Sequence, residues 1–310
     1  MLRYFPFPST FDLKMGTNAL AADHPVVEMD EHYVTEVVLK RSLLKESNDY
    51  YFKAAPVSLP AQWEVLDKIL TTLSLSHPQH FHYEKRSDQC SWENELLKEK
   101  IEFVLRDLAS LPLAPLDWVG RQVQEDLLLL DAASILQAGQ LCFPSGWDLG
   151  AKFQKHFLDL HAPVPSLMTP TLRAADKLIE RIPIHKPIAR TNWGFRMTEQ
   201  MDLSSRHTQG YLKLLEEKAS EITEENAGDK IFVRSERQTL SRLPSGFVLF
   251  TIHTYNSLLK DECTNVDRAK AMHSFLQTVP KELLEYKLVT TFVGKLVRYL
   301  EHVTLQGGKI

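Results

Sequence analysis

The chain has 310 residues, 44% of them hydrophobic and 25% charged, which is enough apolar material for one large core or two modest ones. Its formal net charge is -4 and it has no basic run, so we expect neither nucleic acid nor an anionic membrane surface as a partner. Three scattered cysteines without a CxxC pair indicate a reducing compartment. With no signal peptide and no apolar run of about 18 residues, we expect a cytoplasmic protein that does not span a membrane.

The first third of the chain predicts an arm followed by helices. Residues 1–35 are rich in proline and aromatic residues and predict an extended arm. Apolar residues then recur at helical spacing in three stretches, 31–47, 60–75 and 93–111, each of which predicts an amphipathic helix. The polar stretch between the second and third, 77–92, predicts a loop.

The middle of the chain changes to short apolar runs of strand length. Runs at 124–131 and 134–143 predict two strands, and 147–160 returns to helical spacing. A further helix is expected over 169–182, with Thr169 as its N-cap and Pro170 in its first turn. Three more strands are expected, the last two joined by a turn at Pro-Ser-Gly, and their ranges are 186–197, 230–243 and 246–255.

The polar segment 199–229 predicts a surface insertion, and the chain is helical again from Val266 to about His302 with a break at Pro280. This order predicts an α+β fold: a five-stranded, mostly antiparallel sheet with flanking helices and added N- and C-terminal helical sections. The order strand, strand, helices and three strands is also that of the PAS fold. We expect three parts in one compact unit: an arm and helical section (1–115), a PAS-like core (116–260) and a C-terminal helical section (261–310).

The first candidate for a ligand-binding residue is His161, which ends an amphipathic run and is followed two residues later by Pro163. The proline stops the helix and holds the imidazole at a fixed corner. One interpretation is a helix-capping imidazolium, which the helix dipole favours. The other is a proximal ligand to a haem iron, which needs a neutral imidazole aimed by a partner on its second nitrogen. His185, also flanked by prolines, is a second candidate ligand.

Two strand segments carry polar faces. In the first, Arg190 and Asn192 alternate with Trp193 on the other side, and an arginine beside a carboxamide suits a carboxylate or propionate and a small polar ligand. In the second, Arg234 shares one face with Glu236 and Gln238, while Arg237 lies on the other. These arginines and Arg242 could hold an anionic cofactor or pair with Glu125 and Asp126. Exposed edge strands are the alternative to a binding site.

The remaining motifs favour structural roles. Ser145 precedes a glycine, but GxSxG is absent, so a serine hydrolase is not supported. Ser145 or Asp148 is expected to cap the next helix. Cys142 could bind iron as a thiolate, but we expect it to be a small buried hydrophobic residue. No GxGxxG, P-loop or HExxH motif occurs, so phosphate cradles and zinc proteases have no support.

Several segments resemble, in the same order, the family of the haem-dependent oxidative N-demethylase α subunit. The resemblance runs from about residue 5 to residue 300 and is carried by PFP near the start, KMG at 14–16, MDEHY at 29–33, VGRQVQEDLLLL, LCFPSGWDL, HAPVPSL, ARTNW and RSERQTLSRLPSGFVLFTIHTY. It implies a PAS-like core that holds haem b, and an oxygen-dependent conversion of a small secondary amine, dimethylamine, to methylamine and formaldehyde. Electrons would come from NADPH through a separate reductase subunit carrying FMN and an iron–sulfur cluster.

Within this resemblance we choose His161 as the iron ligand, because it lies in the HAPVPSL motif and in the helical crossover where haem ligands of a PAS fold usually lie, and we expect Arg190, Arg234 and Arg237 to bind the propionates. Asn192 and Trp193 would shape the distal or substrate side. His253 stands where we expect the family to favour arginine, which adds another candidate ligand. The alternative function is a non-catalytic PAS-like sensor that binds haem or a small ligand. The identity of the amine, the reductase partner and the oligomeric state stay open.

Overall fold

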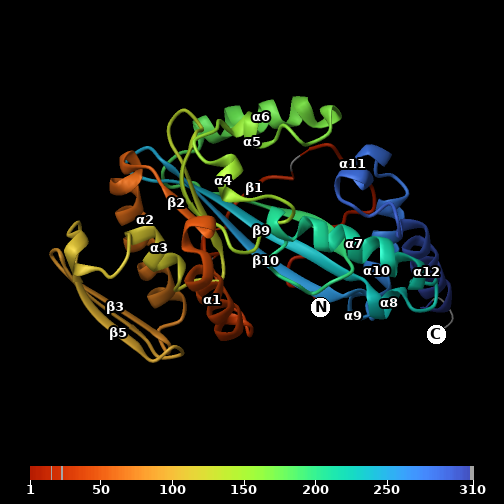
Figure 1. Cartoon of the computed structure of the whole chain (residues 1–310), viewed down its shortest axis with the longest axis horizontal. Coiled ribbons are helices and arrows are strands. Elements are labelled where there is room, and N and C mark those ends of the chain that lie inside the picture. Colours follow the sequence, from red (N-terminus) through yellow and green to blue (C-terminus); the bar gives the residue numbers. More distant parts are fainter. Residues whose placement is uncertain (15, 22–23, 308–310) are drawn as a thin grey trace.

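The computed structural model describes residues 1–14, 16–21 and 24–307. Helices and two antiparallel sheets make up this part of the chain, with the smaller sheet at one end and the C-terminal helices at the other (Figure 1). None of the described helices has both the length and the apolar character that a membrane span requires. Five short 3-10 helices complete the structure: η1 (Pro56–Ser58), η2 (Leu108–Ser110), η3 (Ser166–Met168), η4 (Ser205–His207) and η5 (Ala219–Glu221).

The large sheet has seven strands in the spatial order β1-β8-β9-β10-β6-β7-β2, and every neighbouring pair is antiparallel. Its strands are β1 (Asn18–Ala19), β8 (Ile188–Arg196), β9 (Phe232–Arg242), β10 (Val248–Leu258), β6 (Asp126–Leu130), β7 (Leu136–Gln140) and β2 (Phe52–Ala54). The five strands predicted in the middle of the chain are the five central strands. The count of five was too low, because β1 and β2 from the N-terminal region add one strand to each edge.

The longest hairpin joins β9 to β10 at the predicted turn, where Gly246 N donates to Leu243 O. Gly246 has a φ of 88°, a conformation that a residue with a Cβ rarely adopts. The register pairs Glu236 with Thr254 and Arg237 with His253. Because side chains alternate along a strand, the two pairs point to opposite faces of the sheet.

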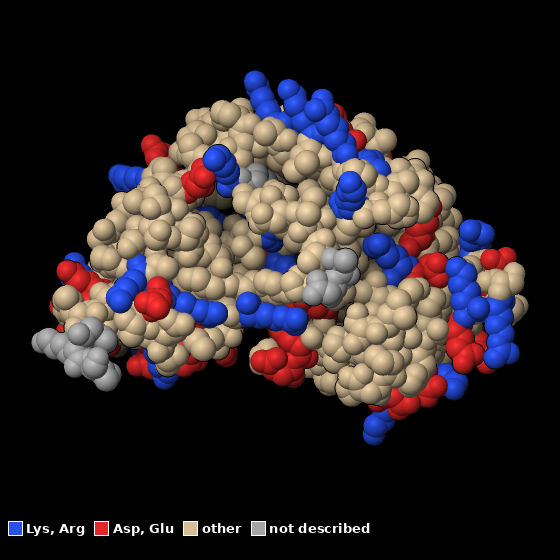
Figure 2. Space-filling view, turned by 180° about the vertical axis from the view of Figure 1, so that it is seen from behind, with Lys and Arg blue, Asp and Glu red and all other residues tan. Residues whose placement is uncertain are grey.

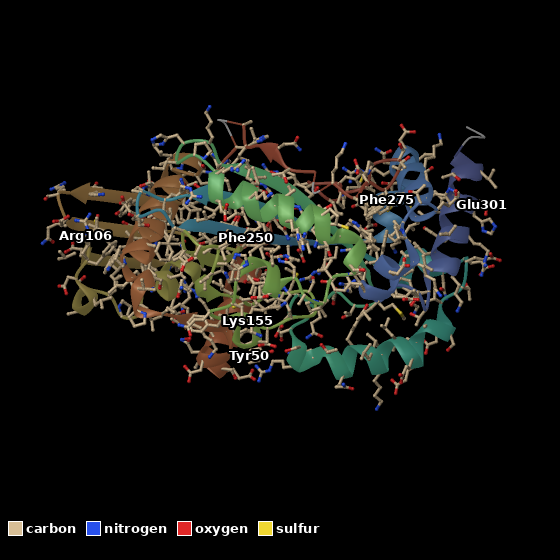
Figure 3. All side chains as sticks on the ribbon, turned by 90° about the horizontal axis from the view of Figure 1, so that it is seen from above. Tyr50, Arg106, Lys155, Phe250, Phe275 and Glu301 are labelled. Carbon is tan, nitrogen blue, oxygen red and sulfur yellow. The ribbon has the colours of Figure 1, made fainter. Side chains whose placement is uncertain are left out.

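One face of the sheet is covered by the connection between β7 and β8. This connection contains α4 (Leu149–Lys152), α5 (Phe157–Leu160) and α6 (Thr169–Arg181), whose apolar residues pack against β6, β9 and β10. Figure 3 shows α6 lying across the sheet, with Phe250 of β10 close to it. Thr169 is the first helical residue of α6, so the N-cap is Met168 and the predicted cap was one residue too late.

The opposite face packs against α1 (Tyr33–Tyr51), α2 (Leu59–Ser76), α3 (Pro115–Gly120) and the three-stranded sheet, which share one core with β6 and β7. The small sheet consists of β3 (Phe81–Arg86), β4 (Gln89–Asn94) and β5 (Glu99–Val104). It overturns two predictions: the expected loop at 77–92 forms β3 and most of β4, and the expected helix at 93–111 contains β5.

The C-terminal helices form a second core around the far ends of β8, β9 and β10. They are α7 (Thr208–Lys218), α8 (Ala227–Lys230), α9 (Leu259–Cys263), α10 (Val266–Leu276), α11 (Lys281–Tyr286) and α12 (Val293–Gly307). The predicted break at Pro280 separates α10 from α11. Segment 199–229 is more than a surface insertion, because Tyr211, Leu215 and Ile222 are buried in this core.

Candidate functional site

Figure 2 shows a hollow on the face of the molecule turned away from the view of Figure 1, with Lys and Arg atoms inside it. We use the name recess for the half-buried surroundings of four side chains, His161, Arg190, Asn192 and Lys287. His161, Arg190 and Lys287 are nevertheless surrounded closely by protein atoms, and burial is the largest cause that lowers their pKa values. Close surroundings combined with access to water are expected of residues that line a concave surface.

His161 lies at the C-terminal end of α5, where its Nδ1 donates to the carbonyl oxygen of Phe157 at 2.8 Å. Because a carbonyl can only accept, the proton of the neutral ring is on Nδ1 and Nε2 carries the lone pair. Burial, with a contribution from Lys152 and Arg190, lowers the pKa of His161. A neutral imidazole with a backbone partner on Nδ1 is the form that binds a metal through Nε2.

The other two candidate ligands are placed differently. His185 is exposed in the turn before β8. His253 is fully buried on the face of the sheet opposite to the recess, with Nδ1 3.0 Å from Glu125 Oε1 and Nε2 3.7 Å from Asp30 Oδ2. Within the described residues, no group of three or more His, Cys, Asp or Glu side chains is arranged to hold a metal ion.

Beside these side chains, a polar cluster on β8 and β9 surrounds the buried carboxylate of Glu236. The side chains of Ser145, Asn192 and Gln238 donate to this carboxylate at 2.8, 3.1 and 2.9 Å. Arg190 Nη1 in turn donates to Gln238 Oε1 at 2.9 Å. Burial alone would raise the pKa of Glu236, but Arg234 and the hydrogen bonds from Asn192 and Ser145 outweigh it and lower that pKa, so the carboxylate is ionised.

A comparison with protein families matches residues 17–297 to the haem-dependent oxidative N-demethylase, alpha subunit-like family. The chain belongs to this family. The match confirms the resemblance seen in the sequence and covers both faces of the large sheet, including the recess. The family description indicates haem dependence, and a family of alpha subunits implies a partner subunit.

Two side chains of the recess have the chemistry that a haem site uses. His161 presents an unprotonated Nε2, and Arg190 lies near enough to lower the pKa of His161 by its charge. An arginine suits a propionate, since its guanidinium can donate two parallel hydrogen bonds to a carboxylate. In this family member, one imidazole and one guanidinium therefore lie near each other.

Arg234 and Arg237, also expected near the propionates, have other partners. Arg234 is buried beside the recess and its Nη2 donates to the carbonyl oxygens of Phe143 and Met201, at 2.7 and 3.1 Å, which joins the loop after β7 to the segment after β8. Arg237 lies on the opposite face, where it donates to Pro25 O and its Nε is 3.7 Å from Glu28 Oε2. The sequence correctly separated Arg234 from Arg237 by strand face.

Asn192 and Trp193 are also separated by strand alternation. Asn192 faces the recess, whereas the Trp193 ring packs in an aromatic cluster with Phe7, Phe195 and Phe275. Lys287, at the C-terminal end of α11, connects the two. Its Nζ donates to Asn192 Oδ1 at 3.2 Å and to Trp193 O at 2.6 Å, and it lies 4.4 Å from the centre of the Trp193 ring. Nothing in the sequence around Lys287 pointed to the site.

The residues with expected structural roles behave accordingly. Asp148 caps α4 by accepting from Ala151 N at 2.7 Å. Cys142 is fully buried, and burial raises the pKa of its thiol well above the ordinary value. Arg242, which the sequence grouped with the arginines that could hold an anionic cofactor or pair with Glu125 and Asp126, instead donates to the carbonyl oxygens of Ile182 and Gly246 near the end of α6, away from the polar cluster.

Proposed function

We propose that the chain binds haem b in the recess through His161 and catalyses the oxidative N-demethylation of a small secondary amine such as dimethylamine. The proposal rests on one observation above the others. His161 is held at the end of α5 by its own helix, with Nδ1 donating to Phe157 O and Nε2 left unprotonated beside Arg190. Of the three candidate ligands, this is the one placed at the recess.

Bound haem supplies the redox chemistry by which O2 oxidises an N-methyl group. The protein would contribute the surroundings. His161 would fix the iron, Arg190 would pair with a propionate, and Asn192 would contact the substrate or oxygen from β8. Trp193, whose ring faces away from the recess, is proposed to act indirectly, by supporting Lys287 and the backbone of β8.

A PAS-like core over residues 116–260 belongs to the same proposal. The order of elements along the chain supports it: two strands, three helices and three strands, with α7 and α8 inserted between β8 and β9. The adjacency of β8, β9, β10, β6 and β7 in the sheet also supports it. On this view the arm and helices of 1–115 and the helices of 261–310 are additions to the core. His161 then lies in the helical connection between its second and third strands.

The electrons would come from NADPH through a separate reductase that carries FMN and an iron–sulfur cluster. The sequence supports a separate source, because GxGxxG and clustered cysteines are absent from it. The three cysteines are free and buried, at Cys90, Cys142 and Cys263.

The test begins with absorption spectra of the chain, purified from cells supplied with a haem precursor, before and after reduction and addition of carbon monoxide. We expect a Soret band that shifts with both treatments, and formaldehyde when dimethylamine, O2 and a reductase are supplied. His161→Ala should lose the iron ligand, whereas His185→Ala, a change at an exposed histidine, should keep the spectrum. An unchanged Soret band in His161→Ala, or haem binding without formaldehyde from any secondary amine, would contradict the proposal.

A further inference from the structure

Lys287 is a lysine beside Asn192 to which the proposed function assigns no ligand. Its Nζ has two hydrogen-bond acceptors, Asn192 Oδ1 and Trp193 O, and both are uncharged. Within the described part of the chain, no carboxylate lies within 4.0 Å of this nitrogen, unlike the nitrogens of the ion-paired lysines. A lysine ammonium has three N–H donors, so one donor is left for a further acceptor.

Several charged groups act on Lys287. Arg196 and Arg190 repel its ammonium, and the buried carboxylate of Glu236 attracts it. Burial, followed by repulsion from Arg196, lowers the pKa of Lys287 to about 7. Enclosing a cation in protein is costly, and a bound anion beside it would lower that cost.

We propose that Lys287 binds a carboxylate group of the ligand in the recess, donating its third N–H to it. On the proposed function, on which this inference rests, that carboxylate is a haem propionate. Lys287 and Arg190 would then hold anionic groups from two elements far apart in the sequence, α11 and β8. Trp193 and Asn192 would fix the direction in which the lysine points.

The test compares haemin with its dimethyl ester, which lacks the two negative charges. Lys287→Met keeps the apolar length of the side chain and removes its charge. Lys295→Met is the matched control, because Lys295 Nζ also donates to a backbone carbonyl, that of Ala219, in a different part of the molecule. We expect Lys287→Met to weaken haemin binding by about tenfold or more and to leave ester binding unchanged. Equal losses for haemin and ester, or no loss for either, would overturn the inference.

A second measurement keeps the inference testable if the chain binds no haem. Competitive labelling of the haem-free protein with acetic anhydride across pH, read by mass spectrometry, gives the pKa of Lys287 with the Lys295 peptide as reference. We expect sodium propionate to raise the pKa of Lys287 and not that of Lys295, because an anion stabilises the ammonium. A response to propionate without haem binding would reject the proposed function but keep the anion site. An unchanged pKa would reject the anion site.

Discussion

His253 Nδ1 lies 3.0 Å from Glu125 Oε1, and both side chains are buried on the face of the large sheet opposite to the recess. Glu125 Oε1 also accepts from Glu28 N at 2.8 Å, and the His253 ring stacks on Tyr255 at 4.3 Å between ring centres. The imidazole is therefore held in an ion pair that joins β10 to the segment just before β6. This pair stabilises the side of the sheet that carries no recess.

Replacing one member of the pair should be costly. His253→Gln leaves the Glu125 carboxylate buried without its charged partner, and we expect the free energy of unfolding to fall by about 3–5 kcal/mol. Urea denaturation measures this loss. The double variant His253→Gln/Glu125→Gln should lose less than the two single variants combined, because it leaves no unpaired charge. A loss below about 1 kcal/mol in His253→Gln would show that the pair is not coupled.

The same pair predicts how stability depends on pH. Burial alone would lower the pKa of His253, but Glu125 raises it; burial alone would raise the pKa of Glu125, but His253 lowers it. The histidine's contribution is complete below its ordinary pKa of 6.5 and is lost as pH rises through the raised value. The glutamate's contribution is complete above its ordinary pKa of 4.5 and is lost as pH falls through the lowered value.

The stability difference between the wild type and His253→Gln should therefore be largest between pH 4.5 and 6.5. Urea denaturation at a series of pH values measures it. We expect the difference to shrink on either side of this window. A difference that stays constant across the series would mean that the imidazole is neutral in the folded protein.

Arg190 and Arg234 should respond to substitution in different ways. Arg234→Met removes the donor from two buried carbonyl oxygens, those of Phe143 and Met201, so we expect a loss of about 3 kcal/mol of stability. Haemin affinity of the folded variant should stay near that of the wild type. Arg190→Met should instead weaken haemin binding by about tenfold with a smaller loss of stability.

Urea denaturation and haemin titration of each arginine variant separate the two roles. Arg173→Met, a change at an exposed position on α6, provides the reference for loss of a positive charge alone. The reverse pattern, with haemin affinity depending on Arg234 and not on Arg190, would place the propionates at the loop after β7.

Two glycines provide a test of packing among the C-terminal helices. A Cβ on Gly228 of α8 would overlap the phenol ring of Tyr299 on α12, so Gly228→Ala should cost about 1–3 kcal/mol. Gly210 in α7 has no atom within 4 Å of the position a Cβ would take, so Gly210→Ala should stabilise the protein by about 0.5–1 kcal/mol. Thermal melting of both variants measures the two shifts, and equal signs would show that α8 and α12 are not packed as described.

The sequence predicted the central strands well because their patterns are strong. Residues 127–130 are four consecutive leucines, and all five residues of β6, Asp126 included, are buried. The helices expected at 31–47 and 60–75 were also correct, and the break at Pro280 is in place, but a second break between α11 and α12 was not predicted. The edge strands β1 and β2 could not be predicted, since strands of two and three residues are too short to show a period.

The small sheet was missed because one of its faces is polar. In β4 the buried residues Cys90, Trp92 and Asn94 alternate with more exposed ones, a strand period that was visible in the sequence and not used. In the region of β5, the leucines at 96, 97 and 105 have a helical spacing. That spacing hid the strand alternation of Ile101 and Phe103. The tertiary pairing of β5 with β4 decided between the two periods.

The site was predictable in part. Strand alternation placed Arg190 and Asn192 together and put Arg237 on the other face, as the structure has them. Lys287 could not be found in this way, because it meets Asn192 only through the packing of α11 against β8. The same holds for the hydrogen bond from Ser145 to Glu236, which depends on the loop after β7 folding back over β9.

The recess and the polar cluster beside it draw their side chains from the loop after β7, from β8 and β9, and from the end of α11. These segments meet only after Lys287, 95 residues after Asn192, has left the ribosome. A cofactor held by all of these side chains would therefore be inserted after α11 has left the ribosome. Ribosome-bound chains that stop before α11 should retain less haemin than the released protein of 310 residues. Equal retention would show that the segments before α11 are sufficient to hold haemin.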